Sequence, residues 1–220
     1  MIVCLVTDGR RLCGPDRSFE TMRECLLEQA RFAVDAGIDL FQVRERELEA
    51  GDLARLTADV VRLAAGSRTR VVVNDRLDVA LASGAGGVHL RSDSMPADAV
   101  RRLAPPGFLV GRSVHRADEA VAAGKVDYLV AGTVFASASK PPGSPVIGLA
   151  GLAEIVEAVE WPVLAIGGMS IARAAEVAAA GAAGVAAVEL FIGQTVSDDP
   201  CRATPLGALV SAIRLGFDSG

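Results

Sequence analysis

The feature that most constrains the fold of this chain is an alternation of short apolar runs with amphipathic segments. The apolar runs are continuous, as is typical of parallel strands that are covered on both faces. They lie at residues 2–7, 40–44, 70–74, 87–90, 108–114, 128–135, 163–168 and 184–190. Helical patterns follow them at residues 18–36, 51–65, 76–83, 96–104, 117–123, 149–159, 170–180 and about 203–215. Candidate N-caps and helix-ending glycines support these helices, at Ser18, Ser170, Gly37, Gly66, Gly124 and Gly181.

Eight strands that alternate with eight helices in 220 residues predict an α/β fold, a closed (β/α)8 TIM barrel. An open doubly wound sheet is the alternative. The even period disfavours it, and so does the lack of a lone G-x-G-x-x-G motif at the first helix. Because no linker or shift in composition is visible, we expect a single domain over residues 1–220. Its tail, from about 197 to 220, would close with the last helix.

Charge and composition exclude several classes of protein. The net charge is −5 and the basic residues are scattered, which argues against binding of nucleic acid. The first residues lack the pattern of a signal peptide, and no apolar run reaches the length of a membrane span. The four cysteines match no metal or redox motif. We therefore expect a cytoplasmic protein that binds neither nucleic acid nor membrane.

The second apolar run ends in the motif Q-V-R-E-R, at the end of a barrel strand where active-site residues gather. Gln42, Arg44 and Arg46 occupy alternate positions and so share one face of the strand. Two buried guanidiniums would be costly without an anion, which points to a carboxylate or pyrophosphate ligand. The alternative is a ladder of salt bridges with Glu45 and Glu47.

A glycine pair follows the seventh apolar run and indicates a phosphate site. Gly167 and Gly168 would let a phosphate approach the backbone, and Ser170 would begin a helix whose N–H groups face it. The segment around Val188, after the eighth run, occupies the other half of the site that many barrels use for phosphate. A Gly-Gly turn with a purely steric role is the alternative.

The loop after the sixth apolar run is long and carries the hydroxyls of Ser137 and Ser139 and the amine of Lys140. Loops of this length in a compact barrel are usually functional, often as lids. A variable surface loop is the alternative.

The chain has two histidines, and their positions predict different roles. His89 lies inside the apolar run G-V-H-L and is expected to be a hydrogen-bonded structural residue. His115 ends the fifth strand in G-R-S-V-H, on the face where the other candidate groups converge. An imidazole titrates near neutrality, so His115 is a candidate acid/base catalyst, with a strand-capping role as the alternative.

Together these motifs resemble the thiamine phosphate synthase/TenI superfamily over about residues 2 to 192. The pieces that carry the resemblance are CLVTD, Gln42 to Arg46, Asn74-Asp75, Gly87 to Leu90, Gly111 to His115, Asp127 to Lys140, and Pro162 to Gly168. The resemblance implies a TIM barrel, a thiazole phosphate substrate and a possible homodimer. No single piece is specific, but the ordered set is.

The superfamily contains a synthase, which joins hydroxymethylpyrimidine pyrophosphate to thiazole phosphate and requires Mg²⁺. The resemblance places its metal on Asp75 and on a second aspartate position, which falls here on Ser94, with Asp93 one residue early. In that case the two arginines of Q-V-R-E-R and Lys140 would bind pyrophosphate. Glu189 stands where the family has serine, and its carboxylate would repel a phosphate unless it pointed away.

The superfamily also contains TenI-type thiazole tautomerases, which aromatise the thiazole phosphate carboxylate without a cofactor. The R-E-R motif, Ser94 and G-R-S-V-H resemble them, so we favour a tautomerase with His115 as catalyst and take the synthase as the alternative. A third class is a regulatory protein that binds thiazole phosphate without catalysis. The resemblance and the strand ends give these substrate-binding positions: Gln42, Arg44, Arg46, Asn74, Ser113, Ser137, Ser139, Lys140, Gly167, Gly168 and Val188.

Overall fold

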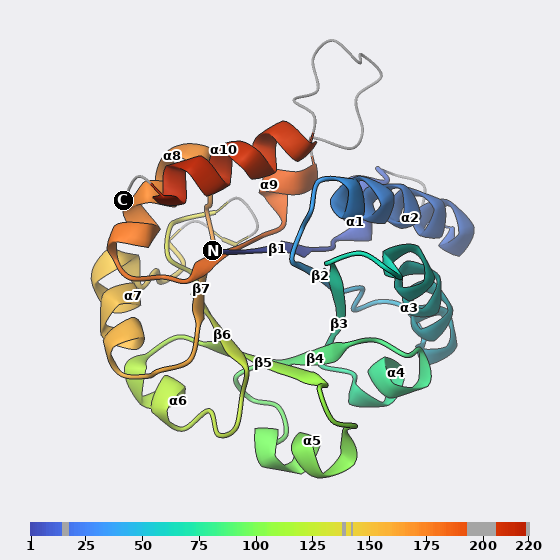
Figure 1. Ribbon diagram of the computed structural model, residues 1–220, viewed down its shortest axis with the longest axis horizontal. Helices are drawn as coiled ribbons and strands as arrows, with labels where there is room; N and C mark the ends of the chain where they lie inside the picture. The colour runs from blue at the N-terminus through green and yellow to red at the C-terminus, as the bar shows by residue number, and fades with distance from the viewer. Residues whose placement is uncertain (15–17, 138–139, 142, 193–205, 219–220) are drawn as a thin grey trace.

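Eight parallel strands close into a barrel in chain order, which confirms the predicted TIM-barrel fold (Figure 1). The computed structural model describes residues 1–14, 18–137, 140–141, 143–192 and 206–218. The ring closes where β1 pairs with β8, with Ile2 opposite Gly184, so the open doubly wound sheet is excluded. The strands are β1 (Ile2–Val6), β2 (Leu40–Val43), β3 (Arg70–Asn74), β4 (Gly87–Leu90), β5 (Leu109–Val114), β6 (Tyr128–Gly132), β7 (Val163–Ile166) and β8 (Gly184–Ala187).

The helices form a ring outside the strands (Figure 1). All eight predicted helices are present: α2 (Phe19–Asp35), α3 (Ala50–Ala64), α4 (Leu77–Ala82), α5 (Ala97–Leu103), α6 (Ala117–Val121), α7 (Gly148–Glu157), α8 (Ile171–Ala179) and α10 (Leu206–Asp218). The last of them, α10, packs against α8 and α2. The rest of the tail, residues 193–205 and 219–220, lies outside the described residues. None of the described helices is long and apolar enough to span a membrane.

Two short helices, α1 (Gly9–Leu12) and α9 (Glu189–Ile192), were not predicted. The eighth apolar run was read as a strand to residue 190, but β8 ends at Ala187. Its last apolar residue, Leu190, belongs to α9, in which Phe191 is fully buried. A continuous apolar run does not reveal where a buried strand ends and a buried helix begins.

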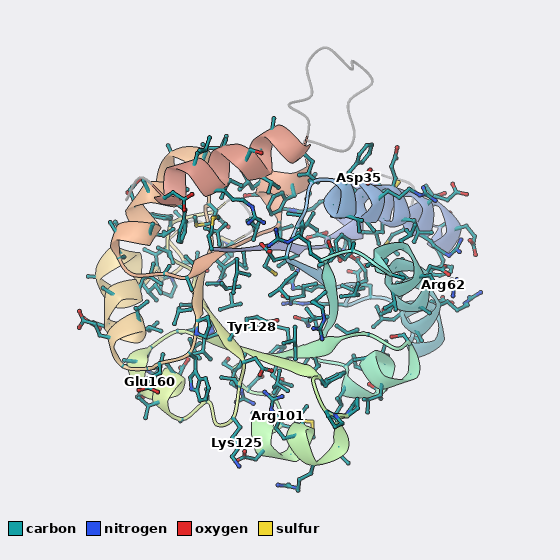
Figure 2. The ribbon with its side chains drawn as sticks, viewed as in Figure 1. Asp35, Arg62, Arg101, Lys125, Tyr128 and Glu160 are labelled. Carbon is teal, nitrogen blue, oxygen red and sulfur yellow. The ribbon has the colours of Figure 1, made fainter. Side chains whose placement is uncertain are left out.

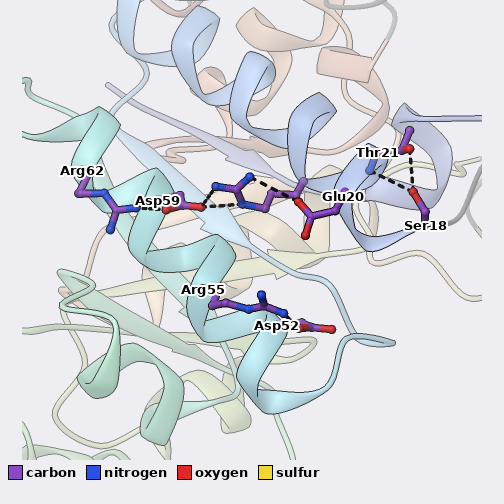
Figure 3. Close-up of polar contacts among 8 residues, drawn as sticks. Ser18, Glu20, Thr21, Asp52, Arg55, Asp59 and Arg62 are labelled. Atoms are coloured by element: carbon purple, nitrogen blue, oxygen red, sulfur yellow. Dashed lines mark hydrogen bonds and ion pairs between the residues drawn. The ribbon is translucent and has the colours of Figure 1, made fainter.

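Helix caps appear where the sequence predicts them. The Ser18 hydroxyl accepts a hydrogen bond from the Thr21 amide at 3.2 Å, at the start of α2 (Figure 3). Ser170 caps α8 in the same way, accepting from the Arg173 amide at 3.4 Å. The four predicted helix-ending glycines all have positive φ, between 70° and 84°.

Helices α2 and α3 are also joined by side chains on their outer faces. The Arg23 guanidinium donates to the Asp59 carboxylate at 2.7 Å, and Arg62 binds the same carboxylate from within α3 (Figure 3). Arg62 lies far from the centre of the barrel, with a side chain 72% exposed (Figure 2). It is therefore a suitable control residue for substitutions in the barrel mouth.

The barrel has one core inside the ring and a larger one between strands and helices. Alternate strand residues point inward, among them Leu40, Val72 and Tyr128, whose ring lies inside the ring of strands (Figure 2). Two residues further along each of β2 and β3, Gln42 and Asn74 occupy the same inward face. The strand period thus brings polar side chains to the carboxyl end of the barrel.

Candidate active site

A cavity of about 510 Å³ opens at the carboxyl ends of the strands. It is lined by His115 and by every predicted substrate-binding residue that the structure describes. Ser139 is the one predicted member that lies outside the described residues. The predicted residues around the cavity are Gln42, Arg44, Arg46, Asn74, Ser113, Ser137, Lys140, Gly167, Gly168 and Val188.

One end of the cavity is basic. The Gln42 amide donates to the Asn74 side-chain oxygen at 3.0 Å, beside Arg44 and Arg46. Within the described residues, neither arginine forms an ion pair. Burial lowers the pKa of Arg44, and repulsion from Arg46 lowers it further. Arg44 is half-buried and Arg46 is exposed, and two neighbouring guanidiniums without an ion-paired carboxylate favour the binding of an anion between them.

The predicted alternative, a salt-bridge ladder along Q-V-R-E-R, does not form. Glu45 turns away from the cavity and is buried, where it accepts hydrogen bonds from the Thr7 hydroxyl at 2.5 Å and the Gly9 amide at 3.0 Å. Burial raises the pKa of Glu45 to about 7, although both donors oppose the change. Glu47 pairs instead with Arg10 on α1.

A cluster of charged and hydroxyl groups lies beside the basic end. Asp75 has a φ of 60°, in the left-handed region that aspartate tolerates better than most residues. Its carboxylate is hydrogen-bonded to the Ser94 hydroxyl and lies 3.6 Å from an Arg91 nitrogen. Asp93 is bound to the same arginine, with Arg91 Nε 2.9 Å from its carboxylate. A cavity of about 220 Å³ adjoins here, lined by Asp75 and Arg91 but not by Asp93.

The other end of the cavity is built from the loops after β7 and β8. Gly167 and Gly168 have φ values of 103° and 61°. A Cβ added at Gly167 would lie 2.4 Å from a Thr133 methyl group, and one at Gly168 would lie 2.4 Å from a backbone oxygen. Only glycine fits both positions, so backbone lines this end of the cavity. Behind it the Arg173 guanidinium binds the Gly168 carbonyl.

The two histidines differ as the sequence predicts. His89 is 2% exposed, with Nε2 2.9 Å from the Ser113 hydroxyl and Nδ1 3.3 Å from the Tyr128 hydroxyl. Burial lowers its pKa to about 3, so it is neutral, held by two hydroxyl groups, although it also lines the cavity. His115 is exposed and lines the cavity, and its Nδ1 contacts the Gly132 carbonyl. A carbonyl only accepts, so Nδ1 carries a proton.

Two residues of the site, Arg91 and Arg11, were given no role from the sequence. Arg91 directly follows β4, and its place at a strand end was an available signal. Arg11 lines the cavity from α1, a short helix that the hydrophobic pattern of the sequence did not predict. Glu189 also lines the cavity, but its carboxylate is paired with Arg11 at 3.0 Å. The expected repulsion of an anion by Glu189 is thus reduced by a neighbouring guanidinium.

The fold and this cavity define a (β/α)8-barrel protein with a basic cavity at the carboxyl ends of its strands. The chain belongs to the TMP-TENI family, described as thiamine monophosphate synthase, whose profile matches residues 12–191. The superfamily resemblance is thereby confirmed.

Named relatives agree with this membership. A thiamine-phosphate synthase from Methanoregula boonei is 43% identical over 76% of this chain and 78% of its own length. One from Roseiflexus castenholzii is 39% identical over 92% of this chain and 85% of its own. Among solved structures, a thiamine phosphate pyrophosphorylase from Pyrococcus furiosus has a TM-score of 0.79 and 30% identity, covering 99% of this chain and 96% of that one.

These relatives support the synthase alternative and not the tautomerase that the sequence led us to favour. The preference for a tautomerase depended on Ser94, taken as the loss of a metal ligand. In the structure the Ser94 hydroxyl still lies against the Asp75 carboxylate, so an oxygen atom occupies that side of the cluster. The substitution therefore does not by itself imply chemistry without a metal.

Proposed function

We propose that this protein is a thiamine-phosphate synthase, which joins hydroxymethylpyrimidine pyrophosphate to thiazole phosphate and releases pyrophosphate. The observation that carries the proposal is the pair Arg44 and Arg46, cations without an ion-pair partner among the described residues, in one cavity with the Gly167-Gly168 turn. A reaction between a pyrophosphate ester and a phosphate ester needs two anion sites that face a shared space. The named relatives support the synthase activity, and the specific substrates are those that the family resemblance implies.

The basic end is the proposed pyrophosphate site. Arg44 and Arg46 would bind its oxygens, and Lys140 lines the same cavity from the loop after β6. As the bond to pyrophosphate breaks, its electron pair leaves with the pyrophosphate and negative charge grows there. Fixed guanidiniums stabilise this charge without reorganising, which is the main catalytic effect that such a site supplies. Gln42 and Asn74, already hydrogen-bonded to each other, would orient the pyrimidine end.

The synthase reaction implies Mg²⁺, and the cluster around Asp75 fits it. Mg²⁺ takes oxygen ligands and is usually held by one or two carboxylates together with substrate phosphates. The Asp75 carboxylate and the adjacent Ser94 hydroxyl are such ligands. Asp93 was the second predicted ligand, but it is paired with Arg91 and its side chain is 66% exposed, so we assign it to holding that arginine. Bound there, the ion would neutralise charge on the departing pyrophosphate.

The described residues contain no cluster of three or more His, Cys, Asp or Glu side chains that could hold a metal. The remaining ligands would therefore come from pyrophosphate and water. This predicts that Mg²⁺ binds weakly to the protein alone and more tightly in the presence of pyrophosphate.

The Gly167-Gly168 turn is the proposed phosphate site of the thiazole substrate. Open backbone and the start of α8 would bind the phosphate there, with the backbone of Val188 on the other side. The hydroxyls of Ser113 and Ser137 and the His115 ring line the space between the two ends and would contact the thiazole. A homodimer stays a prediction from the family, to be checked by light scattering.

The test is an assay of the purified protein with both substrates and Mg²⁺. We expect thiamine phosphate and pyrophosphate in equal amounts. Arg44→Ala should abolish most of the turnover, whereas Arg62→Ala, the same change on the outer face of α3, should not. A protein that binds thiazole phosphate but yields no product would refute the proposal and favour the regulatory binder. Aromatisation of the thiazole tautomer without product would favour the tautomerase.

A further inference from the structure

The cavity contains an ion pair that the proposed chemistry does not use. Arg11 on α1 and Glu189 at the start of α9 lie 3.0 Å apart, NH1 to Oε1, and both line the cavity. They follow β1 and β8, the two strands whose pairing closes the barrel. Their side chains are 34% and 42% exposed, so both are open to a ligand.

The Arg11–Glu189 pair lies near the proposed phosphate site of the cavity. Glu189 follows Val188 directly and lines the cavity together with Gly167 and Gly168. An unpaired carboxylate there would repel a phosphate. Asp8, at the N-cap of α1, also lines the cavity, where its charge acts on Arg44. Arg11 is the cation that offsets the negative charge of Glu189.

The Arg11 guanidinium keeps binding capacity after it has paired with Glu189. Arginine has five N–H donors in a planar fork, and the pair uses NH1. No further side-chain bond of Arg11 is formed within the described part of the chain. A guanidinium that is anchored at one nitrogen loses less freedom when it binds an anion with the others.

We propose that Arg11 is a phosphate-binding residue of this cavity and that Glu189 is a positioning residue that presents it to the phosphate of the substrate. This rests on the proposed function for the identity of the substrate, thiazole phosphate, but not for the class of ligand, a phosphate monoester. The Glu189 carboxylate can then lie beside a phosphate because the Arg11 guanidinium, paired with it, neutralises its charge.

The test measures binding by calorimetry with three probes: thiazole phosphate, the dephosphorylated thiazole alcohol, and inorganic phosphate. Arg11→Ala should weaken binding of thiazole phosphate about 30-fold, the size expected for a lost charge-assisted contact that also leaves a carboxylate unpaired. Binding of the alcohol should not change. Arg10→Ala is the matched control, because Arg10 lies on the same helix, pairs with Glu47 and lies outside the cavity.

The role of Glu189 is tested by rescue. Glu189→Ala alone should weaken phosphate binding only about threefold. The variant loses the positioning of Arg11, which weakens binding, but it also loses the repulsion between the carboxylate and the phosphate, which strengthens it. The double variant R11A/E189A should bind thiazole phosphate about fivefold more tightly than R11A, because the unpaired carboxylate has gone. If the Arg11–Glu189 pair had a purely structural role, the double variant would bind thiazole phosphate no more tightly than R11A.

The outcomes separate this proposal from the proposed function. Equal binding of thiazole phosphate by the wild type and R11A would overturn the role of Arg11 while leaving a functional synthase intact. A double variant that binds no better than R11A would overturn the role of Glu189. Loss of inorganic phosphate binding in R11A, in a protein that does not bind thiazole phosphate, would support the role of Arg11 and refute the proposed substrate.

Discussion

Replacement of Glu45 by Gln should remove a pH-dependent loss of stability. Glu45 is 8% exposed, and burial raises its pKa from 4.5 to about 7. The folded state therefore holds the Glu45 proton more tightly than the unfolded chain. The wild type keeps this contribution below pH 4.5 and loses it as the pH rises to 7. At about 1.4 kcal/mol for each pKa unit, the loss is about 3 kcal/mol, most of it between pH 5 and pH 8.

The assay is urea unfolding of the wild type and E45Q at pH 5 and pH 8. Other titrating groups are common to both proteins and cancel in the difference between their free energies of unfolding. That difference should move in favour of E45Q by about 2 to 3 kcal/mol between the two pH values. Glu47→Gln is the control, since Glu47 is 64% exposed and should show no such trend. A difference for E45Q that is constant with pH would refute the argument, because Glu45 would then be ionised in the folded protein with an ordinary pKa.

Three further predictions concern the cavity. Gly167→Ala should destabilise the fold by about 1 to 3 kcal/mol, because the new Cβ would lie against Thr133. The same change should raise the KM for thiazole phosphate at least about tenfold. An unchanged KM would contradict the assignment of the phosphate site. Arg44→Ala should weaken pyrophosphate binding about 10- to 100-fold, against no change for Arg62→Ala, measured by calorimetry. Chelation of Mg²⁺ should stop turnover reversibly. Asp75→Asn should raise the Mg²⁺ concentration needed for the half-maximal rate about tenfold or more. The same Mg²⁺ dependence in the wild type and in Asp75→Asn would show that Asp75 is not a metal ligand.

The sequence predicted the architecture because each of the eight strands and the eight longer helices carried its own local signal. Continuous apolar runs marked the strands, and Ser18 and Ser170 marked two helix starts that the structure confirms. The strand period predicted that Gln42 faces inward, but β2 ends at Val43, so Arg44 and Arg46 reach the same cavity from the loop that follows it. These signals operate over a few residues, so a single sequence contains them in full.

The chemistry was harder to predict because it depends on contacts between distant residues. Ser94 was interpreted as a lost ligand, since nothing local shows that its hydroxyl meets Asp75, 19 positions away. A salt-bridge ladder of Glu45 with its neighbouring arginines was the alternative to an anion site, but Glu45 instead accepts hydrogen bonds from Thr7 and Gly9, in the segment after β1. Contacts between side chains of different loops depend on the order of the strands around the barrel. The direction of a side chain beyond the end of a strand follows no period in the sequence.

The seam where β1 pairs with β8 joins the first and last strands of the barrel, and the Arg11–Glu189 pair links the segments that follow these two strands. A phosphate bound by Arg11 and by the loop after β8 would span this seam and so tie together the strands that are most distant in sequence. A ligand that binds only the closed ring stabilises it by about 2.7 kcal/mol at 100 times its Kd. The ring would then open less often in the presence of substrate, so the substrate-bound protein should resist proteolysis better than the free protein.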